Sequence, residues 1–203
     1  QACGVSINFK ATVPALIDPG KDSKEKPKLL GNESAQLVEA LNKWPTTPEA
    51  PNLLPVKLID KINQWQELLQ DSVNNGVYRC GFARNQKAYD LASTELFNAL
   101  QKIEDSLSIN GPWLCGDELT LADIRLFPTL IRWELVYEPL FGCSEKPLWS
   151  FPNLFQWRKK FFEMEKISET CNSLAWRQDY FGALFPLRPS NIIPAGPELK
   201  KIV

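Results

Sequence analysis

Four prolines within a short segment divide this chain more sharply than any other feature of its sequence. The segment KWPTTPEAPNLLP at residues 43–55 cannot continue a helix, because proline lacks a backbone N–H and its ring clashes with the preceding turn. A stretch of this composition is typical of a linker between domains. We therefore expect an N-terminal part over residues 1–44, a linker over 45–55, and a second part over 56–203.

The part before the linker has the pattern of a small α/β unit. Residues 12–17, TVPALI, form a short apolar run that predicts a strand, with Pro14 at an edge or near the strand's start. A charged loop follows, and residues 28–30 predict a second strand, antiparallel to the first. A helix should then begin near residue 33. Its apolar face would consist of Leu37, Val38, Ala40 and Leu41.

The part after the linker predicts helices throughout, because apolar side chains recur at steps of three and four residues. The predicted helices cover residues 55–72, 86–108, 150–164 and 168–178, together with one that begins at Thr120. Thr120 and Asp123 have the spacing of a capping box, and Pro128 should kink that helix. We therefore predict a mainly α fold, in which a bundle of about five helices follows the α/β segment.

Composition excludes several kinds of chemistry. The chain has no histidine, which removes Ser-His-Asp catalysis, Cys-His catalysis and the H-E-x-x-H metalloproteases. None of the five cysteines forms a Cys-x-x-Cys pair, a pattern typical of a reduced, intracellular protein. Because 23 basic residues balance 24 acidic ones, no nucleic-acid partner is expected. No membrane helix is expected either, since no apolar run reaches about 18 residues. Chemistry must use thiol, hydroxyl, carboxylate, amine or guanidinium groups, and no metal is expected.

Residues 74–90, NNGVYRCGFARNQKAYD, join two predicted helices but are unusually aromatic for a solvent loop. Only Arg79 and Arg84 stand near Cys80 to lower its pKa, so we expect an inert, partly buried thiol there. Tyr78 could be a packed aromatic residue with a satisfied hydroxyl. In a chain without histidine, its hydroxyl is also a leading candidate to donate a proton to a developing oxyanion.

Two stretches of the N-terminal part suggest a binding site. Backbone groups near Val13 and Pro14 could pair with an extended peptide ligand. Glu33 and Ser34 stand where a helix begins, so its free N–H groups could hold a carboxylate and Glu33 an ammonium. Such a set suits the γ-glutamyl end of glutathione. Taken alone, these residues favour a simpler interpretation, in which Ser34 is only an N-cap and Glu33 a first-turn acid.

Two further features have more than one interpretation. RQDYFGALFP at residues 177–186 places Tyr180 in what reads as an aromatic turn, for which packing is the simpler explanation. Arg125 and Arg132 are seven residues apart and share one face of the kinked helix. They could pair with acids such as Asp123 or face a substrate, and the sequence does not choose between these roles.

Several motifs together resemble one family. In order along the chain these are TVPALID, LLGNESAQLV, NNGVYRCGFARNQKAYD, GDELTLADIRLFPTLIRWELVY and NIIPAGP. They resemble the glutathionyl-hydroquinone reductases, the Xi class of glutathione transferases, over nearly the whole chain. The resemblance implies a thioredoxin-like domain, of which residues 1–44 would be the second half, followed by an all-helical domain. It also implies a homodimer formed largely through the helical domains, in the cytoplasm or, in a plant, the plastid stroma.

The resemblance further implies a mechanism with glutathione as co-substrate. In this family a thiolate attacks the glutathionyl sulfur, the hydroquinone leaves, and a second glutathione resolves the enzyme–glutathione disulfide. Val13 and Pro14, with Pro14 in the cis form, would pair with the glutathione backbone, and Glu33 and Ser34 would hold the γ-glutamyl group.

The same resemblance assigns Tyr78 to donate to the substrate or leaving oxygen, and Tyr180 to line the hydroquinone pocket. This chain departs from the family in two respects. It contains no Cys-Pro-Trp-Ala-type motif, and Cys3 is too close to Val13 for a strand, helix and strand to lie between them. We therefore expect the nucleophilic cysteine upstream of this chain, and this chain alone to be inactive. Where the family has a histidine and paired tyrosines near the C-terminus, this chain has Asp179-Tyr180-Phe181.

Two alternatives stay open. The chain could be a non-catalytic glutathione-transferase-like module that binds a partner or a hydrophobic ligand, since function lies in sites and not in folds. It could also be an ordinary transferase that activates glutathione with a tyrosine or serine hydroxyl. A Cys-Pro-x-x motif upstream would favour the reductase, and conjugation of a generic electrophile would favour the transferase.

Overall fold

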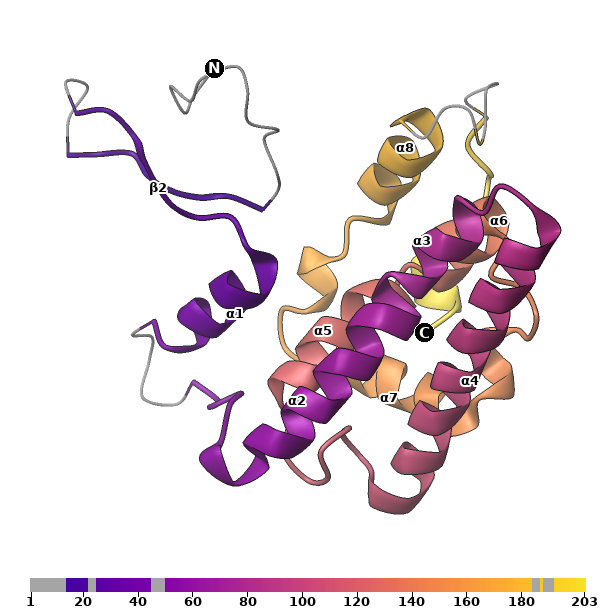
Figure 1. The fold of residues 1–203 in the computed structure, drawn as a ribbon, viewed down its shortest axis with the longest axis horizontal. Helices are drawn as coiled ribbons and strands as arrows, with labels where there is room; N and C mark the ends of the chain where they lie inside the picture. The colour runs from indigo at the N-terminus through magenta and orange to yellow at the C-terminus, as the bar shows by residue number, and fades with distance from the viewer. Residues whose placement is uncertain (1–13, 22–24, 45–49, 184–186, 188–191) are drawn as a thin grey trace. The chain divides into compact units, whose positions relative to one another are not determined.

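The computed structural model describes residues 14–21, 25–44, 50–183, 187 and 192–203 of the chain. The chain divides into two compact units, Gln1–Leu54 and Pro55–Val203, and each is described here by itself. Figure 1 shows a small α/β unit and a larger helical one. This architecture confirms the predicted mainly α fold class.

The N-terminal unit holds a two-stranded antiparallel sheet and one helix. Strand β1 (Leu16–Asp18) pairs with β2 (Lys28–Gly31), with Ile17 opposite Leu29 and a shift in register between Leu16 and Ile17. Both strands and their antiparallel pairing were predicted, although β1 begins later than expected and Pro14 precedes it. Helix α1 (Ser34–Asn42) follows β2 after two residues.

The C-terminal unit is a helical bundle. Its longer helices are α2 (Ile59–Leu68), α4 (Gln86–Asn110), α5 (Leu121–Leu130), α7 (Pro152–Phe162) and α8 (Ser173–Ala183). Its shorter helices are η1 (Val56–Leu58), α3 (Gly76–Gly81), α6 (Glu138–Phe141), η4 (Leu148–Ser150), η5 (Ser168–Thr170) and η6 (Leu199–Lys201). Two segments are π-helical. Segment η2 (Leu69–Asn74) continues α2, and segment η3 (Trp133–Tyr137) follows α5. Helix α4 packs against α3 and α7, and α5 packs against α2 and α7.

The core of the bundle is apolar and rich in aromatic residues. The largest fully buried apolar side chains are Trp133, Phe151, Phe181, Ile62, Leu69, Leu96, Leu100, Ile103, Leu114, Leu121 and Leu126. Five of these residues, Ile62, Leu69, Leu96, Leu100 and Ile103, belong to the apolar pattern from which the first two helices were predicted. Burying one such side chain stabilises the fold by about 1.5–3 kcal/mol, so this core holds the helices in place.

A buried carboxylate joins the start of α5 to two other segments. Thr120 and Asp123 form the predicted capping box, in which the Thr120 backbone N–H donates to Asp123 Oδ2 (3.0 Å). Asp123 Oδ1 accepts from the Leu114 backbone N–H (3.0 Å) and from the Trp157 indole N–H (2.9 Å). Burial raises the pKa of Asp123, and these hydrogen bonds oppose that rise. Asp123 is thereby committed to structure and unavailable to Arg125 or Arg132.

Helix α7 begins against a carboxylate from another helix. Glu104, buried on α4, accepts hydrogen bonds from the backbone N–H groups of Asn153 (3.1 Å) and Leu154 (2.8 Å). The Asn153 side chain also donates to Glu104 (2.7 Å). The first N–H groups of a helix have no partner within the helix, so Glu104 serves as a cap supplied by tertiary structure.

Two segments differ from their prediction. Residues 74–90 were expected to connect two helices, but Gly76–Gly81 forms helix α3, because Val77 and Cys80 lie one turn apart and are both buried. The helix expected to be continuous and kinked at Pro128 is α5, η3 and α6 in succession. Pro128 lies inside α5, which ends two residues later, and the chain continues in the wider π-helical turn of η3.

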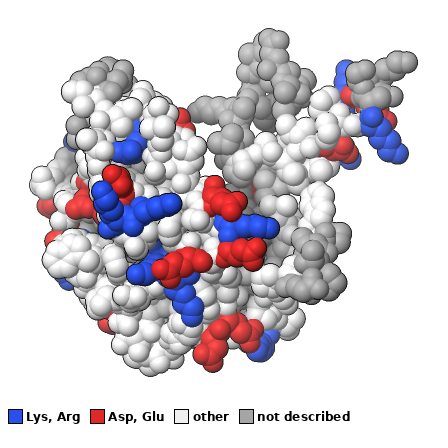
Figure 2. Space-filling view, turned by 180° about the vertical axis from the view of Figure 1, so that it is seen from behind, with Lys and Arg blue, Asp and Glu red and all other residues white. Residues whose placement is uncertain are grey.

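Charged side chains of both signs lie on one face of the molecule (Figure 2). Figure 2 shows one face of the molecule, on which basic and acidic side chains of the described residues lie next to one another. Such alternation offers no single-sign field to a polyanion. Among the described helices, none is both long and apolar enough to cross a membrane.

Candidate active site

Three tyrosine hydroxyls from three different helices meet in the C-terminal unit. Tyr78 on α3 and Tyr180 on α8 have their hydroxyl oxygens 2.6 Å apart, and the oxygens of Tyr137 on η3 and Tyr180 are 3.1 Å apart. Tyr180 is thus the middle member of a hydrogen-bonded chain, which we call the tyrosine cluster. The sequence suggested Tyr78 and Tyr180 but not Tyr137, because Tyr137 ends an apolar run, WELVY, that reads as core.

The ring of Phe141 on α6 packs against all three rings of the tyrosine cluster. Its ring centroid is 5.2 Å from that of Tyr78, 5.6 Å from Tyr137 and 6.2 Å from Tyr180, all in tilted or edge-on geometry. The ring can approach α3 because residue 81 is glycine. A Cβ at Gly81 would overlap the Phe141 ring and lie 2.9 Å from its Cβ. Gly81 therefore permits the contact that sets the position of all three phenols.

The tyrosine cluster runs from a buried end to an open end. Tyr137 is 4% exposed, whereas Tyr78 is 38% exposed. Burial, together with its hydrogen bond to Tyr180, raises the pKa of Tyr78 to about 12. Burial also raises the pKa of Tyr137, and a negative charge on Tyr180 would raise it further. Both hydroxyls are therefore protonated at neutral pH, and the open end at Tyr78 can donate a proton or a hydrogen bond to a ligand oxygen.

The structure gives different surroundings to Arg125 and Arg132, whose roles the sequence left undecided. Arg125 donates from Nη2 to Gln70 Oε1 (2.6 Å), and its backbone carbonyl accepts from Asn74 Nδ2 (3.2 Å), so it joins α5 to η2. Arg132 instead stacks on Trp176 of α8, with its Cζ 4.4 Å from the ring centroid. The positive charge of Arg132 lowers the pKa of Tyr78 and of Tyr137, against the larger effect of burial. Arg132 is therefore the arginine that faces the tyrosine cluster.

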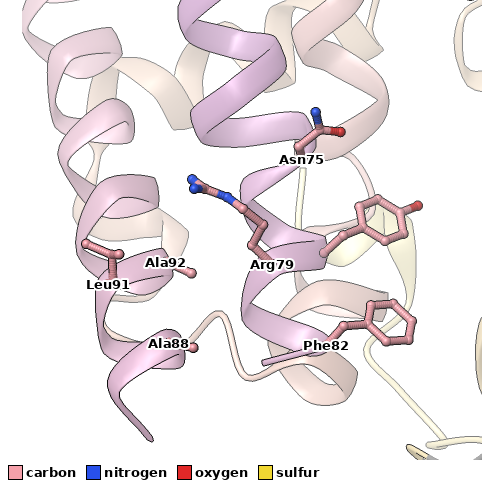
Figure 3. A pocket seen from close by; sticks show the side chains of 7 residues that line it. Asn75, Arg79, Phe82, Ala88, Leu91 and Ala92 are labelled. Carbon is pink, nitrogen blue, oxygen red and sulfur yellow. The ribbon is translucent and has the colours of Figure 1, made fainter. Parts of the chain in front are cut away.

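A cavity of about 710 Å³ opens beside Tyr78, between α3 and α4. Its lining residues are Asn75, Tyr78, Arg79, Phe82, Ala88, Leu91 and Ala92. Figure 3 shows the Arg79 side chain extending from α3 toward α4, while Phe82 turns its ring the other way. Arg79 is paired with Glu95 at 2.6 Å. Tyr78 thus belongs to the tyrosine cluster and also lines an open, largely apolar cavity. The size of this cavity suits a small aromatic ligand.

Cys80 lies one turn along α3 from Val77 and is 3% exposed. A hydrogen bond with Cys143 lowers its pKa, burial opposes that change, and the Arg79 charge lowers the pKa slightly further. The Cys143 thiol, fully buried, has its pKa raised by the same hydrogen bond and by burial. Sequence reasoning considered Arg79 and missed Cys143. Despite its lowered pKa, Cys80 has little access to a substrate sulfur.

The other predicted site residues belong to the N-terminal unit. Val13 lies outside the described residues, and with it the Val13–Pro14 peptide bond; Pro14 is exposed, two residues before β1. Glu33 occupies the N-cap position of α1 and Ser34 the first helical position, so the interpretation of Ser34 as an N-cap is wrong. The Glu33 side chain makes no capping hydrogen bond, and both side chains are exposed. Within the described residues, no group of three or more His, Cys, Asp or Glu side chains could hold a metal ion.

The chain as a whole is similar to known proteins of one family. A sequence profile of the glutathione S-transferase C-terminal domain matches residues 86–160. The chain is 34% identical over 190 residues to the glutathionyl-hydroquinone reductase PcpF of Sphingobium chlorophenolicum, covering 93% of this chain and 59% of PcpF. It is 35% identical over 190 residues to the glutathionyl-hydroquinone reductase YqjG of Escherichia coli, covering 93% of this chain and 56% of YqjG.

Solved structures give the same result. The glutathione-bound structure of YqjG matches with a TM-score of 0.79 at 34% identity, covering 85% of this chain and 57% of that one. The Xi glutathione S-transferase of Phanerochaete chrysosporium matches with a TM-score of 0.77 at 35% identity, covering 83% of this chain and 59% of that one. The chain therefore spans less than two thirds of the length of these relatives.

Proposed function

Because this chain belongs with the glutathionyl-hydroquinone reductases, the Xi class of glutathione transferases, we propose that the protein reduces glutathionyl-hydroquinones with glutathione as co-substrate. The observation that carries the proposal is the hydroxyl chain Tyr78–Tyr180–Tyr137, whose oxygens are 2.6 and 3.1 Å apart. A chain of phenol hydroxyls with one open end suits an aromatic diol, because the hydroxyl at the open end donates to the diol oxygen as charge develops there.

The proposed reaction is the reductive cleavage of a thioether, followed by a thiol–disulfide exchange with a second glutathione. A cysteine thiolate attacks the glutathionyl sulfur, and the carbon–sulfur bond to the hydroquinone ring breaks. The electron pair of that bond stays with the ring, which is thereby reduced, while the thiolate and the glutathionyl sulfur are oxidised to a mixed disulfide. The ring takes up one proton. Glutathione then attacks the mixed disulfide, regenerating the thiolate and releasing glutathione disulfide.

We propose that the attacking thiolate comes from outside these 203 residues. Among the described cysteines, Cys80, Cys115 and Cys143 are buried and Cys171 is half-buried, and burial raises the pKa of both Cys115 and Cys171. These environments do not suit a reactive thiolate. The sequence contains no Cys-Pro-x-x motif, and the relatives that match are longer than this chain. On this proposal, residues 1–44 are the second half of a thioredoxin-like domain.

Glutathione would bind to the N-terminal unit through Val13, Pro14, Glu33 and Ser34. Support comes from the start of α1, where the exposed Glu33 and Ser34 side chains stand at a helix N-terminus without a capping role. The free N–H groups and positive dipole end there favour a carboxylate, and the Glu33 carboxylate is matched to an ammonium group. The amino acid portion of glutathione presents both groups.

Two assays test the proposal. The first measures glutathione-dependent release of hydroquinone from a glutathionyl-hydroquinone, by the full-length protein and by this 203-residue chain. We expect turnover only by the full-length protein. Turnover by the 203-residue chain would show that the nucleophile lies within it, and would revive Cys3 or Cys80. No turnover by either, with retained binding of aromatic ligands, would favour the non-catalytic binding module.

The second assay measures glutathione affinity by titration calorimetry on the full-length protein. Loss of a hydrogen bond to a charged group costs about 1.5–3 kcal/mol, so Glu33→Gln and Ser34→Ala should each weaken binding about tenfold or more. Glu39→Gln is the matched control, because Glu39 is an exposed acid on the same helix, farther from its N-terminus. Equal glutathione affinities for all three variants would show that glutathione does not bind at the N-terminus of α1.

A further inference from the structure

We propose that Arg132 is a positioning and specificity-determining residue that makes the tyrosine cluster a site for phenolate oxygens in preference to neutral phenols. This inference rests on the proposed function and deepens it, because it names the charge state of the aromatic group that the site holds. It is carried by the place of Arg132 between two tyrosine-bearing elements and by the absence of a counter-ion among its described neighbours.

Arg132 stands where two elements of the tyrosine cluster meet. It precedes η3, the segment that ends in Tyr137. Its guanidinium lies over Trp176, 4.4 Å from the ring centroid. Trp176 and Tyr180 are four residues apart on α8, so they share one face of that helix. A single side chain thus links the element that carries Tyr137 to the face that carries Tyr180.

The charge of Arg132 is not neutralised within the described part of the chain. Arg132 Nη1 donates to the Pro128 carbonyl oxygen (2.5 Å), which is a neutral acceptor. No described carboxylate lies within 4.0 Å of the guanidinium. The acid two residues along, Glu134, is engaged by the buried Arg158, which donates to both of its oxygens at 2.6 and 3.0 Å. A half-buried cation beside hydroxyl donors is an electrostatic match for an anionic oxygen.

The titratable groups around the tyrosine cluster respond to this charge. The positive charge of Arg132 acts to lower the pKa of Tyr78, of Tyr137 and of Cys171. The groups that face Tyr78 and Tyr137 are the other two tyrosines of the cluster and Arg132. Of these, Arg132 alone carries a positive charge, so it is the one that favours an anion. A ligand phenolate at the open end would experience the same field.

This preference has a direct use in the proposed reaction. The hydroquinone first moves one hydroxyl proton to the ring carbon that bears sulfur. When the carbon–sulfur bond then breaks, the electron pair passes into the ring and negative charge develops on the oxygen that gave up its proton. The Tyr78 hydroxyl at the open end can donate to that oxygen, but a neutral donor does not distinguish strongly between phenol and phenolate. A fixed positive charge does distinguish them, because it interacts with the charged form only. The phenolate then takes one proton from the Tyr78 hydroxyl, which regains a proton from solvent.

The test is the binding of 4-nitrophenol, a small phenol whose ionised form is coloured, to the full-length protein. Its dissociation constant is measured by absorbance at a pH below and a pH above the pKa of free nitrophenol. A nearby opposite charge commonly shifts a pKa by one unit or more, so wild-type protein should bind the phenolate about tenfold more tightly than the phenol. Arg132→Met should abolish this difference, and Arg132→Lys should keep most of it.

Two further variants separate the charge of Arg132 from its packing. Trp176→Leu removes the stacking partner and keeps the charge, so the preference for phenolate should persist even if overall affinity falls. Arg125→Met is the matched control, because Arg125 is also half-buried but is bound to Gln70. It should leave the preference unchanged. Circular dichroism and thermal unfolding identify any variant that fails to fold.

Three outcomes would overturn the inference. If a folded Arg132→Met variant kept the preference, the charge of Arg132 would not be its source, and Arg132 would be merely structural. Loss of the preference in Arg132→Lys as well as in Trp176→Leu would assign the effect to stacking and not to charge. No preference in the wild-type protein would remove the premise itself. Because the readout is binding, a protein that prefers phenolate without reducing glutathionyl-hydroquinone would overturn the proposed function and leave this inference standing.

Discussion

The hydroxyl oxygens of Tyr78 and Tyr180 lie 2.6 Å apart although 102 residues separate them in the chain. Helix α3 supplies one and helix α8 the other, and Phe141 of α6 contacts both rings. Because Tyr180 also contacts the buried Tyr137 of η3, four elements together set the open end of the tyrosine cluster. The first prediction concerns that open end.

Tyr78→Phe should lower hydroquinone release by the full-length protein about 10²-fold, the usual loss when a positioned proton donor is removed. The ring remains to pack on Phe141, so thermal stability should change little. Tyr89→Phe is the control, since Tyr89 donates to the Gly142 carbonyl (2.5 Å) and lies outside the tyrosine cluster. It should leave turnover intact. Equal turnover in Tyr78→Phe and wild type would remove Tyr78 from the mechanism.

Alkaline titration should reveal the raised pKa of Tyr78. Its ordinary value is 10.0 and its value in the fold is about 12, so the folded state holds the proton more tightly than the unfolded state. The stabilisation is fully present below pH ~10 and is lost as the pH rises toward ~12. Ultraviolet absorbance at increasing pH should therefore show a tyrosine that ionises late, together with falling stability across this range. Loss of the late step in Tyr78→Phe would assign it, whereas its persistence would point to Tyr137.

Gly81→Ala should damage the site through packing alone. The added Cβ would overlap the Phe141 ring, which must move away from α3 and from the phenols. Overpacking of this kind costs about 1–3 kcal/mol of unfolding free energy, measured by chemical denaturation. Turnover by the full-length protein should fall as well, because Phe141 would no longer pack against the three tyrosine rings in the same way.

Gly76→Ala provides the matched control on the same helix. A Cβ there would meet Leu96 Cδ1 at 3.4 Å, an ordinary contact. Alanine is also the better helix former, so this change should be neutral or stabilising by up to about 1 kcal/mol. If Gly76→Ala destabilised the protein as much as Gly81→Ala, backbone freedom in α3 would matter more than the Phe141 contact.

Cys80→Ala should leave turnover nearly unchanged. The thiol is buried against Cys143 and has no path to a substrate sulfur, despite its lowered pKa. Thiol reagents should accordingly label Cys80 slowly in the folded protein and rapidly after unfolding, as followed by mass spectrometry. Loss of a catalytic group typically lowers turnover by more than about tenfold. A fall of more than about tenfold in a folded Cys80→Ala variant would therefore restore Cys80 as a catalytic candidate.

Local patterns predicted the architecture well. Apolar spacing found the longer helices, whereas the linker expected from the prolines of residues 43–55 stays a prediction. The capping box at Thr120 and Asp123 was read correctly, because its two residues are three apart. Helix α3 was missed because six residues are too few for a clear period, and it forms where Val77 and Cys80 are buried.

The candidate site was predictable only in part, because its distances depend on tertiary structure. Tyr78 was suggested by the lack of histidine and by the family's motifs, and Tyr180 was assigned to the site by the motifs. Nothing in either local stretch reveals that the two hydroxyls touch. Tyr137 was overlooked because a tyrosine at the end of an apolar run looks like core, and its ring is indeed buried. The roles of Arg125 and Arg132 diverge through their partners, Gln70 and Trp176, which lie in other helices.

The Glu104 carboxylate has a consequence for how the bundle acquires its structure. Helix α7 receives its N-terminal cap from α4, nearly fifty residues earlier, through bonds to Asn153 and Leu154. The first turn of α7 is therefore stable only once the two helices have docked, and its formation is coupled to the association of distant segments. Local opening of α4 near Glu104 would therefore also free the start of α7, so these two helices should open together.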